Sequence, residues 1–291
     1  MSVSVILTSY NARQLRACLE ALVAQPGADE IIVADCSQHN PADVLAVDFP
    51  RVRFLHFSET RTVPALRWAA LRHCRGDVVA ALEARSVPAP NWCAVLAEAH
   101  AANRDTLAIG GPVAPAQRGS ARDEGLYFCE YGLFAPPVAV GPVTELSGAN
   151  LSYKRAALEA CADLLAAGAW ETQLHARWRS QPNALRLSTA TVYFVNEMSA
   201  PTALRQRFAY GRGYAAARFD RGERLRRLVY AACCPVLPLL LTCRIGRSLL
   251  GKGLLARFGR ALWWVILFNS AWSVGECVGY VLGASATAEN F

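Results

Sequence analysis

The sequence predicts an α/β domain with a mixed, mostly parallel sheet flanked by helices, followed by a helical, membrane-associated C-terminal region. Three observations predict this. Short apolar, β-branched runs alternate with helical patterns through about residue 85. Of the 291 residues, 53% are hydrophobic, which is ample for a core. After residue 200 the composition changes to a basic segment and then to two long apolar stretches.

The N-terminal part supplies strand and helix patterns in strict alternation. The run SVSVILTSYN begins the chain, and apolar residues at helical spacing follow it at once, as expected for a buried parallel strand and its crossover helix. We expect strands at 3–8, 30–35, 52–57 and 77–82, and helices near 13–24, 41–47, 63–74 and 91–103.

Polar and charged residues follow several of these strands. Tyr10 and Asn11 follow the first strand, Asp35 ends the second, and Glu83 and Arg85 follow the fourth. In open parallel sheets, ligands bind outside the carboxyl ends of the strands. These five residues are therefore candidates for a binding site.

The charge of the chain is concentrated in one segment. Residues 1–200 carry 17 Lys and Arg against 19 Asp and Glu, whereas residues 201–260 carry 13 against 2. These arginines adjoin apolar runs and no groove-reading motif, so nucleic-acid binding is disfavoured. The ten cysteines show neither a CxxC pair nor Cys/His metal spacing. Because no signal-like leader precedes the first strand, we expect the N-terminal domain to face a reducing cytosol.

Several stretches match one family in order and spacing. They are SVILTSYN, IIVADCS, the segment from Glu83 to Trp92 (EARSVPAPNW), SGANLSYKR at 147–155 and WETQLHAR at 170–177. Together they resemble the inverting family-2 glycosyltransferases, which have the nucleotide-sugar GT-A (Rossmann-like) fold. The resemblance covers about residues 2–215. It implies a nucleotide-sugar donor, a UDP- or GDP-sugar, and a divalent Mn or Mg ion.

The resemblance also suggests which residues bind the donor. An aspartate at a strand end accepts hydrogen bonds from ribose or base, and an aromatic ring covers the base, so we assign Tyr10, Asn11 and Asp35 to this role. The alternatives are a rim aromatic for Tyr10 and a helix N-cap for Asp35. Arg67, on the helix before the fourth strand, is a further donor-site candidate or else a solvated helix arginine.

The chain departs from the family at the expected metal ligands. Relatives usually end the fourth strand in Asp-x-Asp and place a His after the last strand. Here Glu83 and Arg85 replace the two aspartates, and Phe194 stands in place of the His, so Glu83 is the one metal-ligand candidate left. We expect the Arg85 guanidinium to neutralise part of the pyrophosphate charge that a divalent ion neutralises in relatives. The alternatives are a decayed site that binds without catalysing, and a solvent-facing loop arginine.

The resemblance places the catalytic base near residue 171. Inverting transfer needs a carboxylate to take the proton of the acceptor hydroxyl. Relatives usually show Glu-Asp where this chain has Glu171-Thr172, so Glu171 is the predicted base. The alternative is an acidic residue stabilised in the first turn of a helix. Gly148 and Asn150 are the acceptor-side candidates, with Glu130, on an expected polar loop, as a weaker one.

We divide the sequence into a glycosyltransferase GT-A-like domain (1–200), a basic amphipathic connector (201–227) and hydrophobic membrane-associated helices (228–291). The connector resembles a segment that closes the donor site in relatives. Its Arg205, Arg207 and Arg212 are candidates for contact with pyrophosphate or with lipid headgroups.

The two apolar stretches differ in length. Residues 228–243 contain two prolines and are short for a span, whereas 261–283 are long enough. Five basic residues lie between them, and a two-span hairpin would carry these charges across the membrane, against the positive-inside rule. We therefore expect a single span at 261–283. In-plane helices or a soluble bundle are the alternatives.

The sequence thus predicts a glycosyltransferase at the cytosolic face of a membrane, acting on a lipid-linked acceptor or a polysaccharide precursor. Such an enzyme belongs to glycolipid or polysaccharide biosynthesis. The alternative is a catalytically impaired family member that serves as a nucleotide-sugar binding or interaction subunit.

Overall fold

The chain forms two compact units in a computed structural model that describes residues 1–116, 119–196, 198–218 and 223–283. The first unit comprises Met1–Ala116 and Pro136–Val195, and the second comprises Gln117–Ala135 and Asn196–Phe291. The domain boundary predicted at residue 200 lies close to Asn196, where the C-terminal part of the second unit begins. The sequence did not indicate that residues 117–135 group with the C-terminal helices. The predicted membrane-associated region ends in residues 284–291, which lie outside the described residues.

The predicted N-terminal elements are confirmed, each to within three residues at either end. The strands are β1 (Val3–Ser9), β2 (Glu30–Asp35), β3 (Val52–His56) and β4 (Val78–Glu83). The helices are α1 (Leu15–Val23), α2 (Ala42–Leu45), α3 (Val63–Leu71) and α4 (Trp92–Ala102). All seven residues of β1 are buried, as expected for a β-branched central strand. The α3 helix begins where Thr62 Oγ1 accepts a hydrogen bond from Ala65 N, with Pro64 in its first turn.

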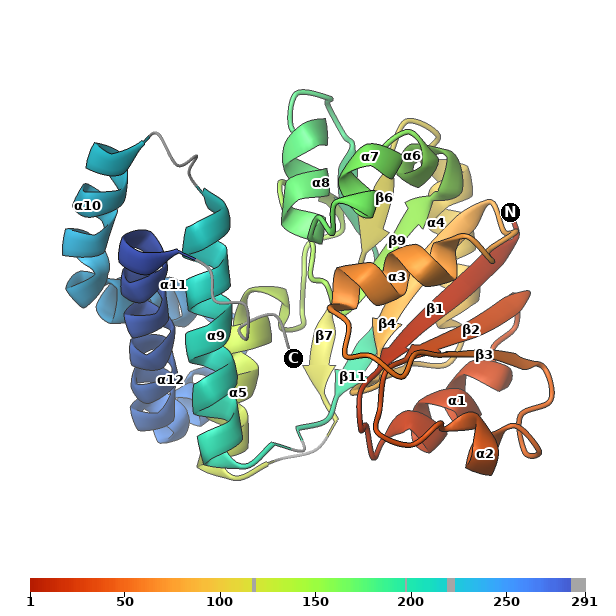
Figure 1. The fold of residues 1–291 in the computed structure, drawn as a ribbon, viewed down its shortest axis with the longest axis horizontal. Coiled ribbons are helices and arrows are strands. Elements are labelled where there is room, and N and C mark those ends of the chain that lie inside the picture. The colour runs from red at the N-terminus through yellow and green to blue at the C-terminus, as the bar shows by residue number, and fades with distance from the viewer. Residues whose placement is uncertain (117–118, 197, 219–222, 284–291) are drawn as a thin grey trace. The chain divides into compact units, whose positions relative to one another are not determined.

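The main sheet has eight strands in the order β3-β2-β1-β4-β9-β6-β10-β8. Its later strands are β6 (Ala108–Gly110), β8 (Gly141–Pro142), β9 (Asn150–Lys154) and β10 (Leu185–Leu187). The first four strands run parallel, and β9 runs antiparallel to both β4 and β6. A second sheet contains β5 (Ser86–Pro88), β7 (Val113–Pro115) and β11 (Val192–Phe194). The predicted mixed, mostly parallel sheet flanked by helices is therefore confirmed (Figure 1).

The strand order indicates which edge of the main sheet is suited to bind a ligand. From β1 the chain adds β2 and β3 on one side and then crosses to add β4 on the other. The order reverses between β1 and β4, and at such a switch point the carboxyl ends of the strands border a crevice that suits a ligand. Tyr10, Glu83 and Arg85 follow or end these two strands. The helices α6 (Arg155–Glu159), α7 (Ala162–Ala166) and α8 (Glu171–Trp178) complete the first unit.

The second unit is helical. It contains α5 (Ala121–Tyr131), the 3-10 turn η1 (Gly132–Phe134), α9 (Ala200–Arg218), α10 (Arg224–Cys233), the 3-10 turn η2 (Cys234–Val236), α11 (Leu237–Ser248) and α12 (Leu255–Leu282). The polar loop expected around Glu130 is wrong, because Ser120 and Asp123 form a capping box that starts α5 and apolar residues bury one side of it. The apolar stretch at 228–243 belongs to a longer helical segment, 224–248, interrupted by η2 at its prolines.

Candidate active site

The two departures from the family pattern lie side by side in the first unit. The Arg85 Nη2 atom donates to Glu83 Oε2 at 3.1 Å, and its guanidinium carbon lies 5.4 Å from the centre of the Phe194 ring. The pairing of β5 with β11 places Ser86, the residue after Arg85, opposite Phe194. Two positions more than 100 residues apart in the sequence, both of which depart from the family pattern, therefore lie next to each other in space.

This arrangement does not fit a divalent ion. The Glu83 carboxylate already pairs with a cation, and the neighbouring Phe194 offers no ligand atom, whereas Mg²⁺ and similar ions need several oxygen ligands. Among the described residues, no group of three His, Cys, Asp or Glu side chains is placed to hold a metal. The Arg85 guanidinium is a positive charge at this edge that a phosphate can meet.

At the neighbouring strand ends, Asp35 orders a loop. Its carboxylate accepts hydrogen bonds from Ser37 N at 2.9 Å and Ser37 Oγ at 2.6 Å, and it contacts His56 Nδ1 at 3.0 Å. The Asn11 N–H donates to the same Ser37 Oγ. Asp35 is only 1% exposed, so a ligand reaches its oxygens only by displacing these partners, whereas Tyr10 is 37% exposed. Donor contact remains a prediction for all three candidates, with Tyr10 the most accessible.

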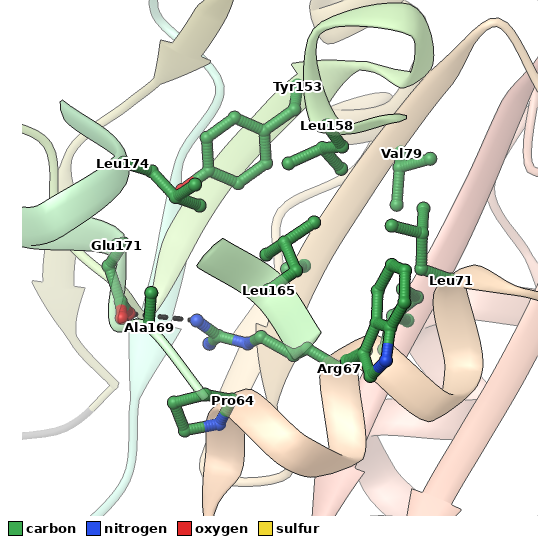
Figure 2. Close-up of a pocket in the computed structure, with 13 residues that line it drawn as sticks. Pro64, Arg67, Leu71, Val79, Tyr153, Leu158, Leu165, Ala169, Glu171 and Leu174 are labelled. Atoms are coloured by element: carbon green, nitrogen blue, oxygen red, sulfur yellow. Dashed lines mark hydrogen bonds and ion pairs between the residues drawn. The ribbon is translucent and has the colours of Figure 1, made fainter. Parts of the chain in front are cut away.

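Arg67 and Glu171, both predicted site residues, bind each other. Arg67 Nη1 on α3 donates to Glu171 Oε1 at the start of α8 at 2.8 Å (Figure 2). Arg67 Nη2 donates to the Gly148 carbonyl at 2.7 Å. A Cβ atom on Gly148 would lie 1.9 Å from Glu171 Oε1, so the carboxylate occupies the space that only a glycine leaves open. The expectation that Arg67 faces solvent as a helix arginine does not hold, because it is paired and largely buried.

The pair has a definite charge state. Burial favours a raised pKa for Glu171, but the charge and hydrogen bond of Arg67 outweigh it and lower that pKa. Burial likewise favours a lowered pKa for Arg67, and the carboxylates of Glu171 and then Glu83 reverse this. Glu171 is therefore ionised at neutral pH. The negative charge of Glu83 also raises the pKa of Arg67, so Arg67 interacts electrostatically with carboxylates at the end of β4 and on α8.

Two further buried groups lie beside Glu171 that the sequence analysis did not assign to the site. His175, one turn further along α8, lies 3.3 Å (Nε2) from the Tyr153 hydroxyl on β9. Burial lowers the pKa of His175 to about 4, although Glu171 opposes the shift. The imidazole is therefore neutral at pH 7. The one sequence signal for His175 was its i,i+4 spacing from Glu171, and nothing in the sequence pointed to Tyr153.

A small cavity adjoins the ion pair. It has a volume of about 40 Å³ and is lined mostly by apolar side chains, with Arg67, Glu171 and Tyr153 among them (Figure 2). This volume holds a few water molecules at most and is too small for a sugar. The cavity therefore surrounds the ion pair with a medium of low polarity, in which opposite charges attract more strongly than in water.

Asn150 does not have the free side chain that an acceptor contact requires. It is fully buried, its Oδ1 accepts from Trp92 Nε1, and its Nδ2 donates to the carbonyls of Pro112 and Ala190. We therefore correct its assignment to a structural one, joining β9 to the loops after β6 and β10. Gly148 keeps its place beside the predicted base, and Glu130 lies on α5 of the second unit.

The three connector arginines have separate environments in the second unit. The Arg207 guanidinium lies 4.5 Å from the centre of the Trp272 ring and the residue is only 6% exposed, and Arg212 Nε donates to the Gly283 carbonyl at 2.9 Å. These two arginines hold α9 against α12, so the prediction that Arg207 offers its charge to a ligand does not hold in this structure. Arg205 is exposed.

Solved structures similar to this chain include a mannosyltransferase. PcManGT from Pyrobaculum calidifontis, solved in complex with GDP-Man and Mn²⁺, matches with a TM-score of 0.57 at 17% identity, over 97% of this chain and 88% of that one. S. aureus TarS (residues 1–349) matches with a TM-score of 0.50 at 13% identity, over 94% and 91%. The search of curated proteins returned no match. The fold is thus the GT-A fold of glycosyltransferases.

A comparison of the sequence with family models gives one match. Residues 4–133 match the model described as glycosyl transferase family 2. This part of the chain therefore resembles the family 2 glycosyltransferases, as the sequence predicted.

Proposed function

We propose that the first unit transfers a sugar, with inversion, from a UDP- or GDP-sugar to an acceptor hydroxyl, and that Glu171 is the general base. The observation that carries this proposal is the ionised Glu171 carboxylate, fixed by Arg67 at the first turn of α8. The GDP-Man in the similar PcManGT structure supports a nucleotide-sugar donor. The switch point between β1 and β4, with Tyr10 and Arg85, is the donor site that we propose.

The proposed reaction is a single displacement. The acceptor oxygen attacks the anomeric carbon while a Glu171 oxygen takes the hydroxyl proton, and the bond to the nucleoside diphosphate breaks on the opposite face. Arg67 binds Oε1, so Oε2 is the oxygen we assign to the proton. Arg67 touches neither reactant in this scheme and acts as a positioning residue.

The leaving diphosphate needs positive charge. Arg85 lies at the mouth of β4, and its planar fork matches phosphate oxygens, although one guanidinium carries less charge than a divalent ion. No step is assigned to a metal, because the residues at this edge do not form a metal site.

We further propose that the acceptor is lipid-linked and that the first unit works at the cytosolic face of a membrane. The support is the pair of helical segments in the second unit, Arg224–Ser248 and Leu255–Leu282, which are long and apolar enough to enter a bilayer.

A second candidate function is nucleotide-sugar binding without catalysis. The observation that favours it is the engagement of Glu171 Oε1 by Arg67, which lowers the basicity of the carboxylate. Both functions place a nucleotide sugar at the same edge, so they differ only in turnover.

The deciding experiment measures nucleotide binding and sugar release by the purified full-length chain across a set of UDP- and GDP-sugars, with chelator and with Mn²⁺. We expect Glu171→Gln to keep nucleotide affinity and to lose about 100- to 10,000-fold in turnover. Glu159→Gln, which removes the carboxylate of an exposed ion pair with Arg155 in the same unit, is the matched control. A wild type that binds these donors but releases no sugar, with or without acceptor lipids, supports the binding subunit instead.

A further inference from the structure

The second unit is built around α12. Phe268 of α12 packs with Leu126 of α5 and Ala203 of α9 in one buried cluster. At Gly275 and Gly279 a Cβ atom would lie 2.1 Å and 2.4 Å from carbonyl oxygens of α9. The backbones of α9 and α12 are therefore nearly in contact, an approach that a GxxxG pair of glycines permits.

The helices on this side of α12 carry many charged residues beside their apolar contacts. On α9 the arginines are Arg205, Arg207, Arg212 and Arg218, and α5 carries Arg122, Asp123, Glu124 and Glu130. Glu124, which is 2% exposed, binds Arg257 and Arg260 at the start of α12 at 3.1 Å and 3.2 Å. A membrane-spanning α12 would carry Arg207 of α9, which packs against Trp272, into hydrocarbon, where an arginine costs about a 100-fold factor in insertion. A span at 261–283 is thus at odds with the packing of α12.

The opposite side of α12 is covered by the helical segment 224–248. One stripe of this segment faces α12: Arg227 Nε donates to the Tyr280 carbonyl at 2.9 Å, and Asn269 Nδ2 of α12 donates to Thr242 Oγ1 at 3.1 Å. The rest of the segment is exposed to solvent, and most of the exposed residues are apolar.

We call this exposed surface the α10–α11 face. Its apolar members are Leu225, Leu228, Val229, Tyr230, Val236, Leu239 and Leu240. Leu225 is 77% and Leu239 65% exposed, values unusual for leucines on two neighbouring helices of a water-soluble bundle. Exposed arginines stand at both ends, Arg224 and Arg226 at one and Arg244 and Arg247 at the other. Arg226 pairs with Glu223, which directly precedes the segment, and the segment 224–248 itself contains no acidic residue.

We propose that the α10–α11 face lies in the plane of an anionic lipid bilayer, with its leucines among the acyl chains, its arginines on lipid phosphates, and α12 behind it as support. An amphipathic helix with a basic rim binds a membrane surface in this way. The charge selects the occupant: a second copy of this chain would bring arginines against arginines, whereas an anionic lipid surface complements them. The inference does not depend on the proposed sugar chemistry, and it replaces the predicted single span with in-plane docking.

Vesicle flotation of the full-length chain tests the face. We expect binding to phosphatidylcholine vesicles that contain phosphatidylglycerol, and much weaker binding to pure phosphatidylcholine. Arg244→Gln with Arg247→Gln should weaken binding to the anionic vesicles about 30-fold, because each surface arginine contributes about a fivefold factor. Leu239→Glu with Leu240→Glu should abolish flotation. Val44→Glu with Val47→Glu, exposed valines at α2 in the first unit, is the matched control and should float like the wild type.

A depth measurement separates in-plane docking from spanning. Cys233 and Cys243 are free, exposed thiols ten residues apart on the segment. An environment-sensitive dye on either one, with the other changed to Ser, should be quenched equally by lipids carrying a quencher near the headgroup. In a spanning segment the two depths would differ by roughly 15 Å, at about 1.5 Å per residue. Unequal depths of the two dyes would overturn the proposal. It would also fail if the wild-type chain does not bind the vesicles and instead forms a dimer that Leu239→Glu dissociates.

Discussion

Replacing Arg67 by Met should separate the structural and catalytic consequences of the buried ion pair. Methionine keeps much of the apolar volume of the side chain but removes the guanidinium that binds Glu171 Oε1 at 2.8 Å and the Gly148 carbonyl at 2.7 Å. The Glu171 carboxylate then remains nine-tenths buried without its cation, since its side chain is 12% exposed. Removing one partner of such a pair typically costs about 3–5 kcal/mol of unfolding free energy.

The cost depends on pH in a defined direction. Burial acts to raise the pKa of Glu171, but the charge of Arg67 outweighs it, so the pKa is lowered in the folded chain. The ion pair therefore stabilises the fold at pH values above 4.5, the ordinary pKa of a glutamate. That stability is lost as the pH falls through the folded pKa. The difference in unfolding free energy between wild type and Arg67→Met should therefore be large at pH 7 and should shrink below pH 4.

The same substitution should change the pH dependence of turnover. Without the guanidinium, burial is the largest remaining influence on Glu171 and raises its pKa, so the acidic limb of the rate profile should move to higher pH. A residue with a purely structural role would lower the amount of folded enzyme but leave that limb in place.

The assays are urea unfolding at pH 7 and pH 3.5 and a pH–rate profile for wild type, Arg67→Met, Glu171→Gln and the double variant. The double variant should be more stable than the sum of the single losses predicts, because it leaves no unpaired buried charge. The reasoning fails if Arg67→Met costs less than about 1 kcal/mol at pH 7 and leaves the acidic limb unmoved.

Three other predictions concern the first unit. Arg85→Ala should weaken binding of a nucleoside diphosphate by about 1.5–3 kcal/mol in titration calorimetry, with or without chelator; binding by wild type only when Mn²⁺ is present would contradict this. Gly148→Ala should lower the melting temperature and turnover, because its Cβ meets Glu171 Oε1. Burial lowers the pKa of both His100 and His175 to about 4 from 6.5, so stability should fall by up to about 3 kcal/mol per histidine between pH 6.5 and 4. A urea unfolding midpoint that does not change between pH 6.5 and 4 would refute the prediction for the histidines.

Local sequence pattern was sufficient for the first half of the fold. The strands around residues 3–8 and 77–82 are continuous apolar runs, and such a run between turn residues has few alternatives to a buried strand. The helices between them repeat apolar residues with the helical period. The same local signals located Glu83 and Arg85 at the end of β4, and the order of motifs indicated the family that residues 4–133 match.

The sequence by itself determined the elements, their order, and the residue types at the strand ends. Only the tertiary structure decided which side chains meet. Arg67 and Glu171 are 104 positions apart, and no repeating pattern in the sequence indicates that these two side chains form an ion pair. The buried amide of Asn150 and the placement of α5 beside α12 were likewise hidden. The physical reason is that secondary structure follows from the spacing of apolar residues along the chain, whereas an ion pair or a close helix contact depends on where distant backbones bring two groups together.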